Sequence, residues 1–415
     1  MRASSGRHWR WPERDAWRPG RRRLNRSRSR VIETLSGGQA AIGKMFLTAI
    51  NYGLIKLNDE KAWPDGIKVL EYDNQGGPSE AADKVKAAIN DGAHIIIQGA
   101  SSAIGGQITD DVRKHNLRNP GKEIIYFNVG AEAMEFTGSK CHFYHFRWNG
   151  NAEIRLRALL TAMKDTKTLG TKVYVIGQNY SWGHDVQRLV KEYAKFGNYT
   201  VVGDVIHDVN KIQDFAPYVA KIKETGPDTV ITGNWSSDLL LADEGGRRFR
   251  PQGALRHVLD GPAGQRGQRG RDGDRPLQRV ELYPEANGDA TAKFADDFKA
   301  KMGQYPVFIQ GHTVHGIWGL GEALKKLKPA ADKKLSVKQL AFAMETVSFN
   351  TSMGEVAMRK EDHQALLPLV VATVSKDAKY KVDGTDMGFK PIRLISGKEA
   401  ASPVQSTCKM ERPAS

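Results

Sequence analysis

The chain has 415 residues and a mass of 45.9 kDa, with 40% apolar and 26% charged residues. This length exceeds that of one ordinary domain, and the composition is typical of a globular protein that buries sizeable cores. No apolar run approaches the roughly 18 residues that a membrane-spanning helix needs, which argues against an integral membrane protein.

The net charge of +15 would suggest a nucleic-acid partner if it covered a folded face. Residues 1–30 carry +9 and residues 247–279 carry +6, so these two segments hold the whole excess. The rest of the chain is formally neutral, and we therefore expect no nucleic-acid partner. We predict that residues 1–30 form a disordered or anomalous tail, because they lack an apolar face.

Residues 247–279 form an anomalous Arg/Gly-rich stretch that interrupts an otherwise regular pattern. Both anomalous segments are rich in Arg, Gly and Pro, as a GC-rich gene is when it is translated out of frame. We therefore hypothesise out-of-frame translation, which resequencing of the gene would test.

A regular alternation of strand-like and helix-like segments begins at residue 66. GIKVLEYDN (66–74) is typical of a strand, and SEAADKVKAAIND (79–91) is typical of an amphipathic helix with Ser79 as its cap. AHIIIQG (93–99) is typical of a short buried strand, and it opens into a loop of small residues.

The alternation continues in two series separated by a crossover at CHFYHFRWNGN (141–151). The first series continues with a helix at 106–117 and a strand at 123–130. The second series predicts helices at 151–164, 182–197 and 214–226, and strands at 172–179, 200–207 and 228–235. Such repetition predicts an α/β fold with two mainly parallel sheets flanked by helices.

Loops at the carboxyl ends of parallel strands are the usual place for ligands. In GASSAIGG (99–106), Ser101 and Ser102 offer hydroxyls beside the backbone N–H groups of a helix start, which suits a carboxylate or an amide oxygen. The alternative is a plain turn with a serine cap. Tyr180, Trp182 and Trp235 follow strands of the second series and predict an aromatic wall, with buried packing as the alternative.

Catalytic and metal motifs are missing from the sequence: there is no GxSxG, GxxxxGK[ST], HExxH or strand-following GxGxxG pattern. We interpret His312 and His315 as a structural pair, because two histidines without a nearby acidic partner make a weak metal site. We interpret Asp362 and His363 as structural, because no nucleophile can be named beside them. We therefore predict neither catalytic residues nor a metal or other cofactor.

Two cysteines, Cys141 and Cys408, are too few and too far apart for a zinc site. The residues alone leave open a disulfide or two free thiols. The sequence also shows no basic, apolar and small-residue secretory signal, so export is not visible from it.

Several longer segments resemble the periplasmic solute-binding proteins of branched-chain amino acid uptake. They are LSGG, IGQNYSWGHDV, DFAPYVAKIKETGPDTVITGNW and FNTSMGEVAMRKEDHQALLPLVV. The resemblance runs from about Ile32 to Pro413, except through the anomalous stretch. It implies a type I periplasmic-binding-protein fold whose two lobes are joined by three hinge crossings.

The resemblance also implies where each lobe begins and ends. Lobe 1 would take residues 31–146 and 283–345, lobe 2 would take residues 147–282 and 346–385, and residues 386–415 would form a C-terminal extension. A subgroup of the family has cysteines at similar places, which implies that Cys141 pairs with Cys408.

Carried over by position, the resemblance implies a ligand-binding set that combines three loops of lobe 1 with aromatic residues of lobe 2. The positions are Ser36, Gly37, Ser101, Ser102, Gly130, Ala131, Tyr180 and Trp235. The family usually adds an acid or a tyrosine from the loop after Trp235, and Asp260 is a weak candidate for the acid. Glu132 departs from the family pattern, and it either contacts a ligand ammonium or is solvated.

The function that the resemblance implies is the substrate-binding component of an ABC uptake system. Such a protein binds a small amino acid or related amide between its lobes and delivers it to a permease and ATPase complex. The resemblance implies a periplasmic monomer. The alternative is a cytoplasmic amino-acid or amide-sensing regulator on the same fold, which the missing secretory signal favours.

Overall fold

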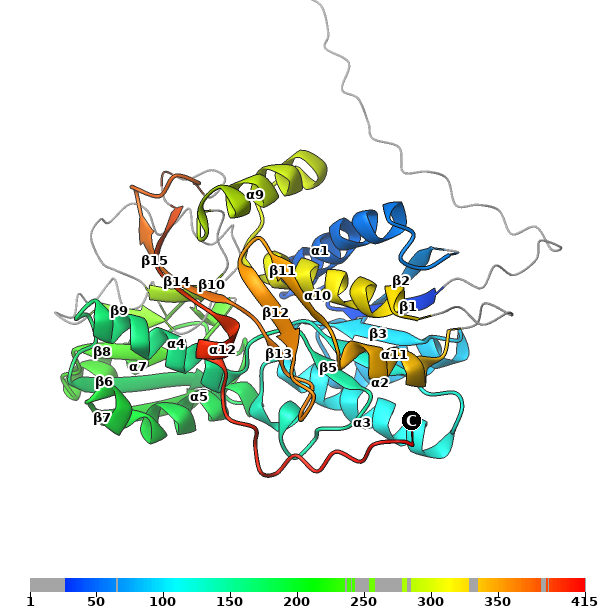
Figure 1. The fold of residues 1–415 in the computed structure, drawn as a ribbon. Helices are drawn as coiled ribbons and strands as arrows, with labels where there is room; N and C mark the ends of the chain where they lie inside the picture. The colour runs from blue at the N-terminus through cyan, green and yellow to red at the C-terminus, as the bar shows by residue number, and fades with distance from the viewer. Residues whose placement is uncertain are drawn as a thin grey trace, which may run out of the picture.

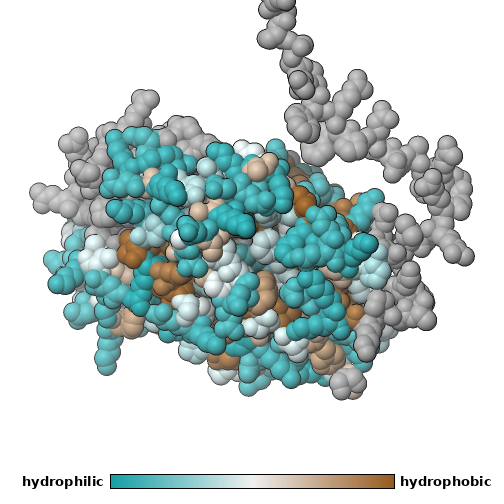
Figure 2. All heavy atoms as spheres, turned by 45° about the horizontal axis from the view of Figure 1, so that its top comes forward, coloured by the Kyte–Doolittle hydropathy of each residue, from teal (hydrophilic) through white to brown (hydrophobic). Residues whose placement is uncertain are grey.

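The structure is a computed structural model in which two α/β bodies lie side by side (Figure 1). It describes residues 27–64, 66–235, 237–239, 241–242, 254–257, 278–281, 285–327, 335–381, 386 and 388–414. No helix in these ranges is long and apolar enough to cross a membrane. On the face shown in Figure 2, hydrophilic residues cover most of the described surface, with apolar residues in smaller groups between them.

The first body is built on a five-stranded parallel sheet with the order β2-β1-β3-β4-β5. Its strands are β1 (Ser27–Glu33), β2 (Ile67–Asp73), β3 (Ile95–Gln98), β4 (Ile125–Asn128) and β5 (His145–Arg147). The connecting helices are α1 (Ala40–Asp59), α2 (Pro78–Asn90) and α3 (Ser102–Arg118), with a 3₁₀ turn η1 (Met134–Thr137) before β5. Every residue of β3 and β4 is buried, as expected for strands covered on both faces.

The predicted tail boundary at residue 30 is wrong, because Ser27–Arg30 form the start of β1. Ser29 and Arg30 are buried, and the Arg30 guanidinium donates a hydrogen bond to the Asp91 carbonyl at 2.9 Å. The polar sequence hides this strand, which β2 and β3 pair on either side. Residues 1–26 lie outside the described residues. Ser79 is also not the cap of α2, whose N-cap is Gly77.

The second body is built on a parallel sheet with the order β7-β6-β8-β9. The strands are β6 (Lys172–Gln178), β7 (Thr200–His207), β8 (Thr229–Thr232) and β9 (Ala254–His257). The helices are α4 (Ala152–Asp165), α5 (Ser181–Glu192), α6 (Ala194–Gly197) and α7 (Ala216–Glu224). Apart from β9, which falls in the stretch interpreted as anomalous, these elements match the predicted second series.

The remaining chain completes both bodies. Three further helices pack on the core of the first sheet: α9 (Gly288–Met302), α10 (Phe308–Lys325) and α11 (Val337–Met344). A small antiparallel sheet packs on the same core and consists of β11 (Ser348–Thr351), β12 (Gly354–Met358) and β13 (Ala365–Leu366). Strands β10 (Gln278–Glu281), β14 (Leu369–Ser375) and β15 (Gly388–Ile395) form an antiparallel sheet beside α4, and α12 (Gly397–Ala400) follows.

These packing partners define the lobes used below. The first lobe holds β1–β5, α1–α3, η1, α9–α11 and β11–β13, and the second lobe holds β6–β10, α4–α7, β14 and β15. Two expectations differ from this arrangement. Residues 347–367 pack on the first lobe rather than the second, since Val356 and Ala365 join its core, and β15 is a paired strand rather than an extension.

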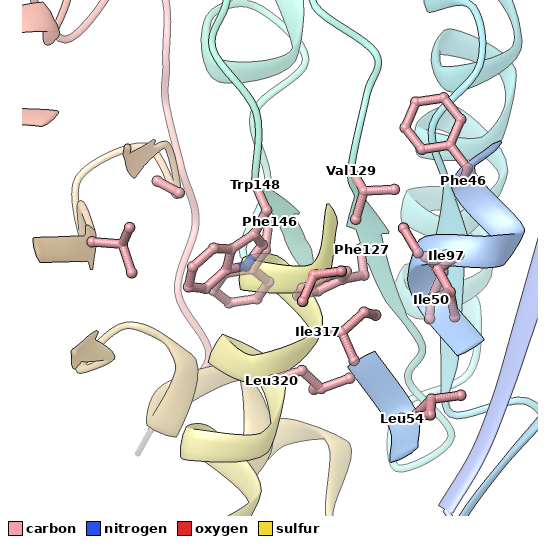
Figure 3. Packing of buried hydrophobic residues seen from close by; sticks show 14 of the residues in the cluster. Phe46, Ile50, Leu54, Ile97, Phe127, Val129, Phe146, Trp148, Ile317 and Leu320 are labelled. Atoms are coloured by element: carbon pink, nitrogen blue, oxygen red, sulfur yellow. The ribbon is translucent and has the colours of Figure 1, made fainter. Parts of the chain in front are cut away.

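The core of the first lobe lies where α10 crosses the sheet and packs along α1 (Figure 3). The two helices approach closely because glycines face large side chains. A Cβ at Gly53 would lie 2.8 Å from Ile317, and one at Gly321 would lie 2.2 Å from Leu57. Trp148, which follows β5, is fully buried against this core and stacks near Phe127. This packing fixes the loops at the carboxyl ends of the first sheet.

The described elements change lobe between β5 and α4, between β10 and α9, and between β13 and β14. After α12, the chain runs along the lower edge of the molecule in Figure 1 to the C-terminus. A disulfide between Cys141 and Cys408, with the two Cα atoms 5.4 Å apart, ties this segment to the first lobe.

Candidate functional site: a cavity between the lobes

A cavity of about 520 Å³, counting space open to solvent, lies where the loops of the two lobes meet. Its lining residues are Ile42, Phe46, Gly99, Ala100, Ser101, Ser102, Gly130, Glu132, Asn149, Tyr180, Trp182, Trp235, Phe308, Ile309 and His312. The loops after β3, β4, β6 and β8 all contribute, as their positions at strand ends predicted. This convergence makes the cavity the candidate ligand site.

The loop between β3 and α3 presents hydrogen-bonding groups to the cavity. Ser101 has a φ of 73°, a left-handed conformation that is uncommon for a residue with a side chain, and its side chain does not cap α3. The predicted alternative of a serine cap is therefore wrong. The Ser102 hydroxyl accepts hydrogen bonds from the backbone N–H groups of Glu132 and Ala133, each at 3.1 Å. Its own proton remains available for an acceptor in the cavity.

A buried acid, Glu33 at the end of β1, hydrogen-bonds the backbone at the start of this loop. Its carboxyl group accepts hydrogen bonds from the backbone N–H groups of Gly99 and Ala100, the second at 3.2 Å. Burial raises the pKa of Glu33 to about 8, although these hydrogen bonds oppose the shift. The sequence does not predict a role for Glu33, whose only signal is its place at the end of a strand, directly after the apolar residues Val31 and Ile32.

The second lobe supplies an aromatic wall. The indole N–H of Trp235 donates to the Tyr180 hydroxyl at 2.6 Å, so the phenol keeps its own proton for another acceptor. Burial raises the pKa of Tyr180 well above its usual value. Trp182 also lines the cavity, but it belongs to the core, and its indole donates to the Gly233 carbonyl at 2.9 Å. Buried packing, the alternative interpretation, is therefore correct for Trp182.

Glu132 is buried rather than solvated, with 8% of its surface exposed. One carboxylate oxygen, Oε1, accepts hydrogen bonds from Asn149 at 2.6 Å and lies 2.7 Å from Nη2 of Arg155. The other oxygen, Oε2, is buried without a hydrogen-bond partner among the described residues. Burial raises the pKa of Glu132, and the positive charge of Arg155 opposes that rise.

Three predicted site residues, Ser36, Gly37 and Ala131, do not reach the lining of this cavity. Ser36 and Gly37 are exposed, and Ser36 hydrogen-bonds Asp73. The backbone N–H and carbonyl of Ala131 both bond the Asn128 side chain, at 2.8 and 3.0 Å. Asp260 lies outside the described residues.

Several lining residues lie in regions for which the sequence predicts no site residue. Phe308 and Ile309 begin α10, and Ile42 and Phe46 lie on α1, where amphipathic spacing is the same for a core residue and a pocket residue. His312 lines the cavity, and its Nε2–H donates a hydrogen bond to the Val129 carbonyl at 2.8 Å. Burial lowers the pKa of His312 to about 3. No cluster of three or more metal-ligating side chains occurs in the described ranges.

Two parallel-sheet lobes with a cavity between them define the class of type I periplasmic binding proteins. The chain belongs to the periplasmic binding protein family, whose profile matches residues 31–379. Proteins of this family bind solutes rather than catalyse reactions, and they work with the permeases of ABC transporters.

Individual relatives agree with this assignment. Leu/Ile/Val-binding protein homolog 4 of Brucella abortus is 50% identical over 386 residues, covering 92% of each chain. A crystal structure of a leucine-, isoleucine-, valine-, threonine- and alanine-binding protein from Brucella ovis in a closed conformation has a TM-score of 0.89 and 47% identity, covering 94% of this chain and 100% of that chain. A solute-binding protein from R. palustris in complex with benzoate has a TM-score of 0.76 at 16% identity and covers 92% of this chain and 99% of that one, which shows the shared fold alone.

Proposed function

We propose that this protein is the substrate-binding component of an ABC uptake system, and that it binds a small amino acid of the branched-chain type in the cavity between its lobes. The observation that carries the proposal is the division of the cavity wall. One part of the wall offers serine hydroxyls and the N-terminus of α3. The rest is largely apolar and aromatic, with residues of α1 and α10 from the first lobe and the rings of Tyr180 and Trp235 from the second. This division suits a ligand with a charged head group and an apolar side chain.

In this proposal, Ser101, Ser102 and the N-terminus of α3 hold the ligand carboxylate. The first N–H groups of a helix have no partner within the helix, and its dipole favours an anion there. The Tyr180 hydroxyl, which retains a free proton, adds a donor from the second lobe. Gly130 places backbone groups at the cavity edge.

The ligand side chain would contact an apolar surface provided by Ile42, Phe46, Phe308 and Ile309. Burying a leucine-sized side chain in such a surface is worth roughly 1.5 to 3 kcal/mol. The relative from Brucella ovis, which is named a leucine-, isoleucine-, valine-, threonine- and alanine-binding protein, favours the same ligand class.

We further propose that the protein acts in the periplasm, as a monomer, and delivers its ligand to a permease and ATPase complex. The family assignment supports this location. We place the lobe boundaries at the first and second crossings expected from the sequence, near residues 147 and 283, and move the third from residue 346 to the segment between β13 and β14.

Calorimetric titration with leucine, valine, glutamate, urea and short amides tests the function. We expect submillimolar binding of at least one branched-chain amino acid, with a rise in the unfolding temperature at saturating ligand because the ligand binds the folded state. Absence of heat with every one of these compounds would contradict the proposal.

A further inference from the structure

We propose that Glu132 is the counter-ion of the ligand's α-ammonium group, so that the cavity takes zwitterionic α-amino acids in preference to amides and amine-free carboxylic acids. This inference rests on the proposed function. It adds a residue that the family pattern does not supply, because the pattern places the ammonium-binding acid in the loop after Trp235.

The first step in the argument is the unequal environment of the two carboxylate oxygens of Glu132. Oε1 already receives Asn149 and Arg155, whereas Oε2 is buried without a partner among the described residues. Leaving a buried charged acceptor without a donor costs free energy that one good hydrogen bond recovers. Because Glu132 lines the cavity, its carboxylate lies within reach of a donor on a bound ligand.

The second step is the position of Glu132 beside the serine loop. Its own backbone N–H donates to the Ser102 hydroxyl at 3.1 Å, so the acid follows directly on the group proposed to hold the ligand carboxylate. The ammonium and carboxylate groups of an α-amino acid are attached to one carbon. Adjacent sites for the two groups therefore match an α-amino acid more closely than a ligand with separated charges.

The third step is the role of Arg155, at the start of α4. Its guanidinium contacts Oε1 of Glu132, donates to the Asn149 side-chain oxygen at 3.0 Å and lies over the Phe308 ring at 5.1 Å from the ring centre. Arg155 therefore orients Glu132 and opposes the effect of burial, which favours the neutral acid. The pair is formally neutral, so a zwitterion adds no net charge to the closed cavity.

The test compares two ligands with two forms of the full-length protein. Leucine is compared with 4-methylpentanoate, which is leucine without its amine, for the unmodified protein and for Glu132→Gln. We expect Glu132→Gln to weaken leucine binding by about 10- to 100-fold, the usual worth of a hydrogen bond to a charged group, and to change 4-methylpentanoate binding by less than about threefold.

A matched control is Glu135→Gln, three residues along the same segment, where the acid pairs with Lys140 and does not line the cavity. This variant should leave both affinities unchanged. An equal loss for both ligands in Glu132→Gln would assign Glu132 a structural role only and overturn the inference. Equal affinity of the unmodified protein for the two ligands would overturn it as well.

If Glu132→Gln fails to fold because Arg155 loses its counter-charge, the paired change Glu132→Gln with Arg155→Met removes both charges. The ratio of the two ligand affinities should then fall by at least about tenfold, and an unchanged ratio would overturn the inference. Failure of the unmodified protein to bind any amino acid would instead refute the proposed function, so the two failures are distinguishable.

Discussion

The two walls of the cavity are built on different chemistry. The first lobe contributes polar groups on two loops, together with apolar residues of α1 and α10. The hydrogen bonds of the polar groups are made within that lobe or to the crossing segment, as for Ser102 and Glu132. The second lobe contributes Tyr180 and Trp235, joined by a single hydrogen bond. We infer that the first lobe fixes the ligand head group, and that the second lobe covers it.

The lobes also differ in how much ionisable surface they bury. The first lobe buries several histidines in their neutral form. A disulfide also joins the C-terminal segment to this lobe. We therefore expect the first lobe to be the more sensitive of the two to acid and to reduction.

The largest expected effect is a loss of stability in acid. Burial lowers the pKa of His142 and His312 to about 3 and of His315 and His363 to about 4, all in the first lobe. The unfolded chain takes up protons near its ordinary histidine pKa of about 6.5, so stability falls as the pH drops from there towards 4. Three acids of the first lobe, Glu33, Glu132 and Glu135, have the opposite sign, since burial raises their pKa values and this favours folding as the pH falls. Burial also lowers the pKa of His145, so five histidines oppose three acids.

We expect a loss on the order of several kcal/mol by about pH 4.5, measured by denaturant unfolding across this range. Hydrogen exchange in acid should rise first in the amides of the first lobe. Constant stability between pH 7 and 4.5, or earlier exchange in the second lobe, would contradict the contrast.

The next effect concerns the disulfide. Cys408→Ser removes a link between residues 267 positions apart in sequence and should lower the free energy of unfolding by about 2 to 4 kcal/mol, measured in denaturant. Leucine affinity at 25 °C should stay within about twofold, because neither cysteine lines the cavity. Ser406→Ala, at an exposed neighbouring position, is the control. A large loss of affinity in Cys408→Ser would show that the C-terminal segment also affects the cavity.

A smaller effect is expected from Ser102→Ala. The change removes a hydroxyl that accepts two backbone N–H groups and leaves its proton for the ligand, so leucine binding should weaken by about 1.5 to 3 kcal/mol. Titration calorimetry measures the loss, with Ser79→Ala on the exposed face of α2 as the control. Binding within twofold of the unmodified protein would remove Ser102 from the site.

The smallest effect is expected for the second lobe. Tyr180→Phe keeps the ring and removes the hydroxyl that bonds Trp235, so leucine binding should weaken by only about 0.5 to 1.5 kcal/mol. Tyr193→Phe, whose hydroxyl bonds Glu153 away from the cavity, is the matched control. If Tyr180→Phe cost more than Ser102→Ala, the division of roles between the two walls would be wrong.

Much of the fold was predictable because buried parallel strands and amphipathic helices leave strong periodic signals. The strand before Gly99, the helix from residue 152 and the strand before Tyr180 all lie where the apolar pattern predicted them. β1 was cut short, because backbone pairing on both sides buries a segment whose side chains are polar. The sequence did not predict α1, because the regular alternation of strand-like and helix-like segments begins only at residue 66.

For the site, the strand pattern was enough to predict which loops line the cavity. Ser101, Ser102, Gly130, Tyr180 and Trp235 all follow strands, and the carboxyl ends of parallel strands meet at one edge of a sheet. Only the tertiary structure decided the roles of Glu33 and Glu132. Whether an acid is solvated, buried beneath a loop or left with one free oxygen depends on neighbours that lie far along the chain, and no local pattern records those neighbours.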